Sequence, residues 1–221
     1  ETLNIPIYLY EYAAKEEKRK NLANVRSGEY EGLKEKISKK EWKPDFGLAF
    51  NKKSGATAIG VRDFLIAYNI NLNTKSTRLA NAIAFDVREK GRIKRKGHPI
   101  IGDIVYDKNG NPEKIPGSLK HVKAIGWYID EFGIAQISMN LTNITETPIH
   151  TVFDEVSKKA EIRGARVTGS ELVGLIPLKS MLDSGKYFLK KQNRSIGIPE
   201  IDIIKVAIES LGLNQVKNFD P

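Results

Sequence analysis

From residue 62 onward, the alternation of apolar residues predicts strands and helices in an order that few folds accommodate. Apolar side chains occupy every second position from Phe64 to Leu72, as they do on one face of a β-strand. The same reasoning predicts a helix capped by Thr74 or Ser76 and running to about Lys90, strands at 122–129 and 134–141, a helix at 148–164 and a strand at 167–176. This is the order of a split βαβ unit. The sequence therefore predicts an α+β fold, a ferredoxin-like βαββαβ layer with helices on one sheet face.

A polar face runs along two of the predicted strands, opposite their apolar faces. Asn69 and Asn71 lie on one strand, and Gln136, Ser138 and Asn140 lie on the other. If the helices cover only one side of the sheet, these side chains lie on the open side. They would then be available to a partner, although a plain solvated face is an equally good interpretation.

Three glycines, Gly47, Gly55 and Gly60, frame a loop that precedes the first of these strands. Glycine lets the backbone pass close to a ligand and reach positive φ at no steric cost. A pliable loop leading into a strand with amides on one face suits a flat, polar heterocycle. From composition alone, an ordinary structural loop is the simpler interpretation.

The formal net charge of +9 favours an anionic partner. Nucleic acid is one candidate, and a substrate with several carboxylates is another. The densest basic run lies at 90–96 and contains no aromatic residue for base stacking. Most such runs are solvated loops, and that interpretation stays open here.

The chain has no cysteine, which excludes disulfides and thiolate metal sites and fits a reducing compartment. No apolar run reaches the roughly 18 residues that a membrane helix needs. The chain opens on the polar stretch Glu1-Thr2-Leu3-Asn4, without the basic start of a signal peptide. We therefore expect a cytoplasmic protein with no membrane partner and no metal.

The remaining segments have weaker patterns. We expect a strand at 5–10, surface helix over 19–38 in two pieces broken near Ser27-Gly28, and final helices opened by Pro177 and Pro199. Residues 92–118 are rich in glycine and proline and predict a loop excursion. Within it, Asn109-Gly110 predicts a hairpin turn that pairs 104–106 with 114–115.

Several stretches, in the right order over nearly the whole chain, resemble the formiminotransferase domain family. The longest is Gly55-Ala56-Thr57-Ala58-Ile59-Gly60-Val61-Arg62 and its continuation to Leu72. It follows Trp42-Lys43-Pro44-Asp45-Phe46-Gly47. The other similar stretches are 5–10, 26–33, 126–128, 135–141, 149–153 and 169–178.

The resemblance implies transfer of the formimino group from N-formimino-L-glutamate to tetrahydrofolate, the co-substrate, in histidine degradation. Both that substrate and a polyglutamylated folate are anionic, which gives the basic charge a use. The family's domain has two related α/β halves with folate bound between them, and it tends to form homodimers. By this resemblance, residues 1–60 are the C-terminal part of the N-terminal subdomain, and residues 61–221 are the C-terminal subdomain.

The resemblance also assigns candidate binding residues. The family's folate-binding stretch falls on the glycine-framed loop, which is one residue shorter here: Gly47, Leu48, Ala49, Phe50, Asn51, Lys52, Lys53, Ser54 and Gly55. Candidates for substrate binding are Arg62 and the strand amides Asn69, Asn71, Gln136 and Asn140. Lys52, Lys53 and Arg62 are the nearest bases for pairing with glutamate carboxylates.

No catalytic residue is predicted within the chain. The family's catalytic histidine lies in a His-Pro-Arg-Met-Gly type motif, which we expect upstream of Glu1, so the chain alone should have little activity. We interpret the similar His98-Pro99-Ile100-Ile101-Gly102 as a coincidence, because it lies in the second half. His150 at a helix start favours a structural role, and we expect His121 at the surface.

The rival hypothesis is a non-catalytic binding module. It would be either an RNA binder on a ferredoxin-like sheet or a folate-binding protein without catalysis. Trp127 and Tyr128 are aromatic, but the aromatic-rich strand motif of RNA-binding sheets is missing. We therefore expect small-molecule partners and no nucleic acid.

Overall fold

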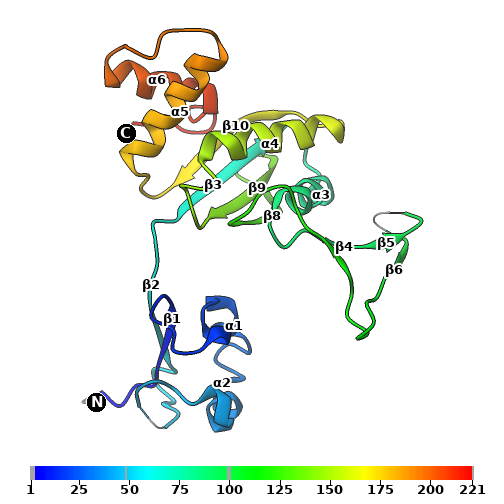
Figure 1. Ribbon diagram of the computed structural model, residues 1–221, viewed down its shortest axis with the longest axis vertical. Coiled ribbons are helices and arrows are strands. Elements are labelled where there is room, and N and C mark those ends of the chain that lie inside the picture. The colour runs from blue at the N-terminus through cyan, green and yellow to red at the C-terminus, as the bar shows by residue number, and fades with distance from the viewer. Residues whose placement is uncertain (1–2, 48, 99–100, 221) are drawn as a thin grey trace. The chain divides into compact units, whose positions relative to one another are not determined.

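The computed structural model describes residues 3–47, 49–98 and 101–220 (Figure 1). The chain divides into two compact units, Glu1–Asp63 and Phe64–Pro221. Helices and strands occur in both units, and the mixed α+β class predicted from the sequence is confirmed.

The first unit is built on two parallel strands, β1 (Ile7–Glu11) and β2 (Thr57–Val61). Between them lie η1 (Glu17–Arg19), α1 (Leu22–Arg26), α2 (Leu33–Ser38) and η2 (Lys40–Trp42). Gly28 adopts a φ of 86° between α1 and α2, which confirms the predicted break. The buried apolar core is small and consists of Tyr8, Val25 and Leu33.

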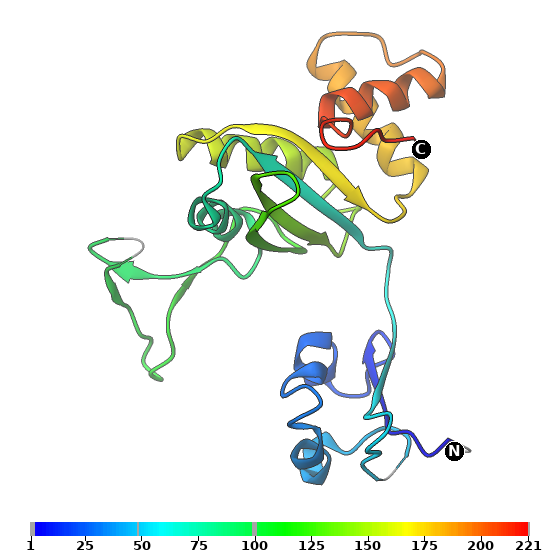
Figure 2. The same ribbon diagram turned by 180° about the vertical axis from the view of Figure 1, so that it is seen from behind.

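The second unit contains an antiparallel sheet of four strands in the order β10-β3-β9-β8 (Figures 1 and 2). The strands are β3 (Ile66–Leu72), β8 (Val122–Ile129), β9 (Ile134–Leu141) and β10 (Val167–Val173). The predicted strands at 122–129 and 134–141 are confirmed. The apolar alternation also predicted strand at residues 62–65, which precede β3 in the structure. Phe64 is 77% exposed because β3 begins only at Ile66.

Two helices, α3 (Thr77–Val87) and α4 (Ile149–Ile162), pack on the apolar face of this sheet (Figure 2). Two more, α5 (Leu178–Lys191) and α6 (Glu200–Leu211), pack on each other beside the edge strand β10. The Ser170 hydroxyl donates to the Leu211 carbonyl at 2.6 Å, and the Ser170 N–H donates to the Gly212 carbonyl at 3.0 Å. A Cβ on Gly212 would lie 2.7 Å from Gly169 Cα, so glycine is required where the two segments meet.

The helix boundaries partly follow the predicted caps. The Ser76 side chain accepts from the Leu79 N–H at 3.2 Å and caps α3 as predicted. The helix ends at Val87 rather than near residue 90, because Arg88 takes an extended conformation with ψ of 144°. Thr147 does not cap α4. Its hydroxyl donates instead to the Lys120 carbonyl.

The excursion predicted at 92–118 carries short strands, which Figure 1 shows beyond α3. They are β4 (Arg92–Ile93), β5 (Arg95–Lys96), β6 (Asp103–Ile104) and β7 (Lys114–Ile115). The predicted turn forms, because the Asp107 carboxylate accepts from the Asn109 and Asn111 N–H groups at 2.8 Å. The predicted pairing of 104–106 with 114–115 is found only in part. Tyr106 forms an antiparallel bridge with Pro112, and the Glu113 N–H donates to the Val105 carbonyl at 2.9 Å, whereas β7 pairs with β4 and β6 pairs with β5.

Among the described residues, no helix has both the length and the apolar character needed to cross a membrane.

Helix α3 lies against the edge strand β8 at Gly126. The Asn81 side chain accepts from the Gly126 N–H at 3.1 Å and donates to the Gly126 carbonyl at 3.0 Å. These bonds occupy backbone groups that an edge strand otherwise leaves unpaired. A Cβ at Gly126 would lie 2.2 Å from the Asn81 backbone nitrogen, so only glycine allows this contact.

We expect Gly126→Ala to lower the free energy of unfolding by about 1–3 kcal/mol, because the added methyl group separates α3 from β8. Urea unfolding followed by circular dichroism measures the change. Gly197→Ala is the control, since a Cβ there meets only the Ser195 hydroxyl at 3.6 Å. Equal midpoints for the two variants would contradict the prediction.

Candidate functional site

The later part of the glycine-framed loop, residues 51–55, is a tight turn with its own hydrogen bonds. Gly47 and Gly55 have φ values of 75° and 64°, as their glycine identity suggested. The Asn51 carboxamide oxygen accepts from the N–H groups of Lys53 and Ser54 at 2.9 and 3.1 Å. The Gly55 N–H donates to the Asn51 carbonyl at 2.8 Å. One predicted member of the loop, Leu48, lies outside the described residues.

Tyr30 holds the loop from behind. Its hydroxyl donates to the Lys52 carbonyl at 2.8 Å, and its ring lies 5.8 Å from the Phe50 ring. Ala49 and the side chains of Lys52 and Lys53 are exposed. The side chains of Lys52 and Lys53 are therefore exposed to solvent, while the Tyr30 hydroxyl holds the turn's backbone at Lys52.

The chain entering the loop is held by a buried ion pair between Arg19 and Asp45. Their side chains are 4% and 3% exposed, and Arg19 Nη1 lies 2.9 Å from Asp45 Oδ2. The same carboxylate oxygen accepts from the Leu9 N–H at 2.8 Å, and Arg19 Nη2 donates to the Lys43 carbonyl at 2.6 Å. The pair therefore links η1, β1 and the segment immediately before Gly47.

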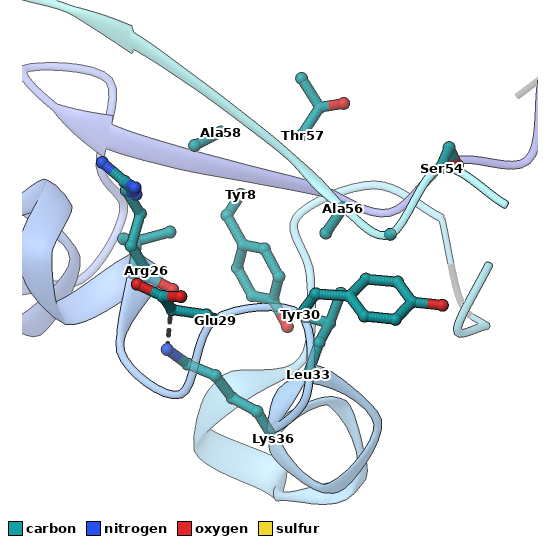
Figure 3. A pocket seen from close by; sticks show the side chains of 12 residues that line it. Tyr8, Arg26, Glu29, Tyr30, Leu33, Lys36, Ser54, Ala56, Thr57 and Ala58 are labelled. Atoms are coloured by element: carbon teal, nitrogen blue, oxygen red, sulfur yellow. Dashed lines mark hydrogen bonds between the residues drawn. The ribbon is translucent and has the colours of Figure 1, made fainter. Parts of the chain in front are cut away.

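A cavity of about 330 Å³ lies beside the end of the loop, within the first unit. Figure 3 shows its lining side chains, which come from β1, from the chain around α1 and α2, and from the stretch at 54–58. The charged members are Arg26, Glu29 and Lys36. Arg26 and Glu29 are exposed, so they are available to a ligand at the rim.

Lys36 is a buried cation with a structural role. Its Nζ donates to the carbonyls of Asn24, Val25 and Ser27 at 2.8, 2.7 and 2.9 Å, and Figure 3 shows Lys36 with a dashed hydrogen bond from its Nζ. The Asn24 and Val25 carbonyls belong to the last turn of α1, where carbonyls lack a full set of partners within the helix, and the Asn24 carbonyl also accepts from the Ser27 N–H at 3.3 Å. Burial lowers the pKa of Lys36. Because its three donors are already used, Lys36 shapes the cavity rather than offering a charge to a ligand.

The predicted open-face amides are mostly not open. Asn140 is exposed, as expected, and Arg62 is exposed in the first unit. Asn69 is 5% exposed, and Asn71 and Gln136 have no exposed surface. The expectation of an accessible amide face is therefore wrong for these three residues. Direct contact of any of them with a substrate stays a prediction.

The buried amides are partners of one another and of the chain after α6. Gln136 Nε2 donates to Asn71 Oδ1 at 2.6 Å, and Asn71 Nδ2 donates to Gln215 Oε1 at 2.6 Å. The Trp127 indole N–H donates to Gln136 Oε1 at 3.2 Å. Asn69 Nδ2 donates to a Glu171 carboxylate oxygen at 3.1 Å. Buried polar groups require such partners, and here neighbours on the same sheet face supply most of them.

The three histidines lie apart in the second unit. His98 is exposed, and His121 is partly exposed, with its ring Nε2 2.9 Å from a Glu146 carboxylate oxygen. His150 is half-buried, stacked on the Tyr187 ring at 4.4 Å, with Nδ1 3.3 Å from the Ser184 hydroxyl. Burial lowers the pKa of His150. Its packing between α4 and α5 agrees with the predicted structural role.

Among the described residues, no group of three or more His, Asp or Glu side chains is arranged to hold a metal ion. Sequence reasoning missed Arg19, Tyr30 and Lys36. Tyr30 lies in a stretch at 26–33 already similar to the formiminotransferase family, which was the available signal. Nothing in the local pattern distinguishes Arg19 or Lys36 from the neighbouring surface cations.

Family comparisons cover nearly the whole chain. The model of the formiminotransferase domain matches residues 67–221, and the model of its N-terminal subdomain matches residues 1–62.

Individual relatives agree with these matches. The chain is 46% identical over 223 residues to formimidoyltransferase-cyclodeaminase of Dictyostelium discoideum and 44% identical over 222 residues to that of Gallus gallus. Each alignment covers 100% of this chain and 37% of the relative. Glutamate formimidoyltransferase of Thermoplasma acidophilum is 38% identical over 192 residues, which is 86% of this chain and 55% of the relative. The chain thus spans little more than a third of the first two relatives.

We expect Asp45→Asn to lower the free energy of unfolding of the first unit by about 3–5 kcal/mol, because Arg19 would stay buried without a carboxylate. Trp42 fluorescence during urea unfolding reports this unit if both proteins carry Trp127→Phe, since the chain has two tryptophans. Glu17→Gln, which removes the exposed Lys20–Glu17 pair, should leave the midpoint nearly unchanged. An Asp45→Asn midpoint equal to that of this control would refute the anchoring role.

We expect Asn71→Ala to cost about 1–3 kcal/mol of stability, because it leaves the buried Gln136 amide without its Asn71 acceptor and removes the hydrogen bond to Gln215. Thermal unfolding followed by circular dichroism measures the loss. Asn140→Ala, on the same sheet face but exposed, should change stability by less than about 0.5 kcal/mol. If both variants behave alike, the amide network does not stabilise the sheet.

Proposed function

The chain belongs to the formiminotransferase domain family, and on that basis we propose that the protein containing it transfers the formimino group from N-formimino-L-glutamate to tetrahydrofolate. The observation that carries the proposal is the succession of the two family models, one over residues 1–62 and the other over 67–221. Relatives named glutamate formimidoyltransferase and formimidoyltransferase-cyclodeaminase support it. We also propose that the protein is a homodimer, on the basis of the family resemblance, and that it is cytoplasmic.

We propose further that the two compact units correspond to parts of the family's two subdomains. The unit boundary at Asp63 and Phe64 falls between the two family matches, which supports this assignment. We assign the sheet of the second unit to a ferredoxin-like layer. The antiparallel order β10-β3-β9-β8 and the succession β3, α3, β8, β9, α4, β10 support that assignment.

The loop at 47–55 is the proposed contact with folate. Its support is a turn, hydrogen-bonded through Asn51 and Tyr30, in which Lys52 and Lys53 are exposed. A rigid loop loses little conformational entropy when it binds a ligand. Exposed Lys52, Lys53, Arg62 and Arg26 offer charge-assisted hydrogen bonds to the carboxylates of folate and formiminoglutamate.

The proposed reaction joins an amine nitrogen of tetrahydrofolate to the amidine carbon of the formimino group. The bond from that carbon to the glutamate nitrogen then breaks, the attacking amine loses a proton, and the departing nitrogen gains one. In this proposal the chain's contribution is positioning, since holding the amine against the amidine carbon removes much of the entropic barrier. The general acid and base are not assigned to residues of this chain.

We expect the full-length protein to convert tetrahydrofolate to its formimino derivative when N-formimino-L-glutamate is supplied, as measured by mass spectrometry of the folate pool. Asn51→Ala should raise KM for tetrahydrofolate by about tenfold with a smaller effect on kcat, because the loop loses its internal anchor.

The matched control is Asn109→Ala in the other asparagine-containing turn, which should leave both constants unchanged. Absence of product with the unmodified protein would reject the proposed activity. Product formation with unchanged KM in Asn51→Ala would reject only the role of the loop.

A further inference from the structure

A second cavity, of about 390 Å³, lies in the second unit between α3 and the chain that follows it. Arg78, Asn81, Ala82 and Phe85 line it from α3, and Arg88, Arg92, Ile93 and Arg95 line it from the segment beyond. Four of these residues are arginines and none carries a carboxylate. Like charges gathered around one hollow repel each other unless an anion enters it.

Two of the guanidinium groups are held in place by the protein. Arg88 lies 4.0 Å over the Phe85 ring, and its Nε donates to the Gly91 carbonyl at 2.9 Å. Arg92 Nη2 donates to the Ala82 carbonyl at 2.8 Å and also contacts the Asp86 carboxylate. Burial, and then the charge of Arg92, lower the pKa of Arg88, so the two guanidinium groups repel each other.

The Asp86 carboxylate, which contacts Arg92, does not neutralise the cavity. Asp86 is shared between Arg92 and Arg163, whose Nε lies 2.5 Å from the other carboxylate oxygen. The ion pairs of the described part of the chain include neither Arg78, Arg88 nor Arg95. Arg95 uses Nη1 for a bond to the Gly102 carbonyl at 2.7 Å, which orients its remaining donors.

The basic run at 90–96 divides by residue type. Its arginines line the cavity, whereas its lysines do not, and Lys94 pairs with Glu113 at 2.6 Å. Arginine presents a planar set of donors that matches two oxygens of one carboxylate or phosphate group, and it is less strongly hydrated than lysine. A site for oxyanions requires arginine in its lining, whereas a solvated basic loop has no such requirement.

We propose that this cavity binds a small organic anion with two or more clustered oxyanion groups, either phosphates or carboxylates. The volume suits a small molecule, and the residues that line it all belong to one compact unit. The site is separate from the loop at 47–55, and its occupation does not depend on the proposed transferase activity.

Calorimetric titration of the purified chain at low ionic strength tests the proposal, with pyrophosphate and citrate as separate probes. The double variant Arg78→Gln with Arg95→Gln should weaken binding at least about tenfold, because each lost charge-assisted bond is worth roughly that factor. Its control is Lys90→Gln with Lys96→Gln, which removes the same charge from the same region but leaves the cavity lining intact. The control should change affinity less than about twofold.

Arg78→Gln alone guards against misfolding, because no hydrogen bond or ion pair joins the Arg78 side chain to the described part of the chain. It should still weaken binding about threefold or more. Saturable binding of pyrophosphate alone identifies phosphate esters as the source of the ligand, and binding of citrate alone identifies carboxylates. Three results would overturn the proposal: no saturable binding of either probe, equal losses in the arginine and lysine variants, or arginine-dependent binding of a single-stranded RNA oligomer in place of both small anions.

Discussion

The first unit depends on the buried ion pair between Arg19 and Asp45, because its apolar core is too small to fix the chain by packing. Among the described residues of that unit, the buried hydrophobic ones are Tyr8, Val25 and Leu33. Bringing two charges out of water is expensive, so such a pair adds little net stability but strongly disfavours arrangements that separate its members. Asp45 also holds Leu9, and Arg19 also holds the carbonyl of Lys43. The chain that enters the loop at 47–55 is thus held by charges that are buried inside the first unit.

The alternation of apolar residues predicted β8 and β9 correctly because each strand has one face in the core. The same alternation failed at Phe64, where periodicity continues past the point at which pairing begins. It also placed Asn71 and Gln136 on the correct face but misjudged their surroundings. Periodicity predicts which face of a sheet a residue occupies, but it does not predict whether another part of the chain covers that face. Gln215, distant in the sequence, closes that side.

The candidate site was predictable where a residue type by itself favours a particular backbone conformation. Gly47 and Gly55 adopt the positive φ that glycine permits, and Asn51 makes the local bonds typical of asparagine in turns. Lys36 was not predictable, because its role depends on three carbonyls around the end of α1 that only the folded chain brings together. The arginine cavity has the same origin, since Arg78 joins Arg88, Arg92 and Arg95 only once α3 has formed.

The contact between Gly169 and Gly212 has a consequence for the timing of folding in the cell. It lets the end of α6 lie directly on β10 and brings Gln215 to Asn71 on the neighbouring strand. During synthesis, β3 emerges early, yet its polar flank has no complete set of partners until the ribosome has passed residue 215. The polar side of β3 therefore gains its full set of partners only after β10 and the chain following α6 have been synthesised.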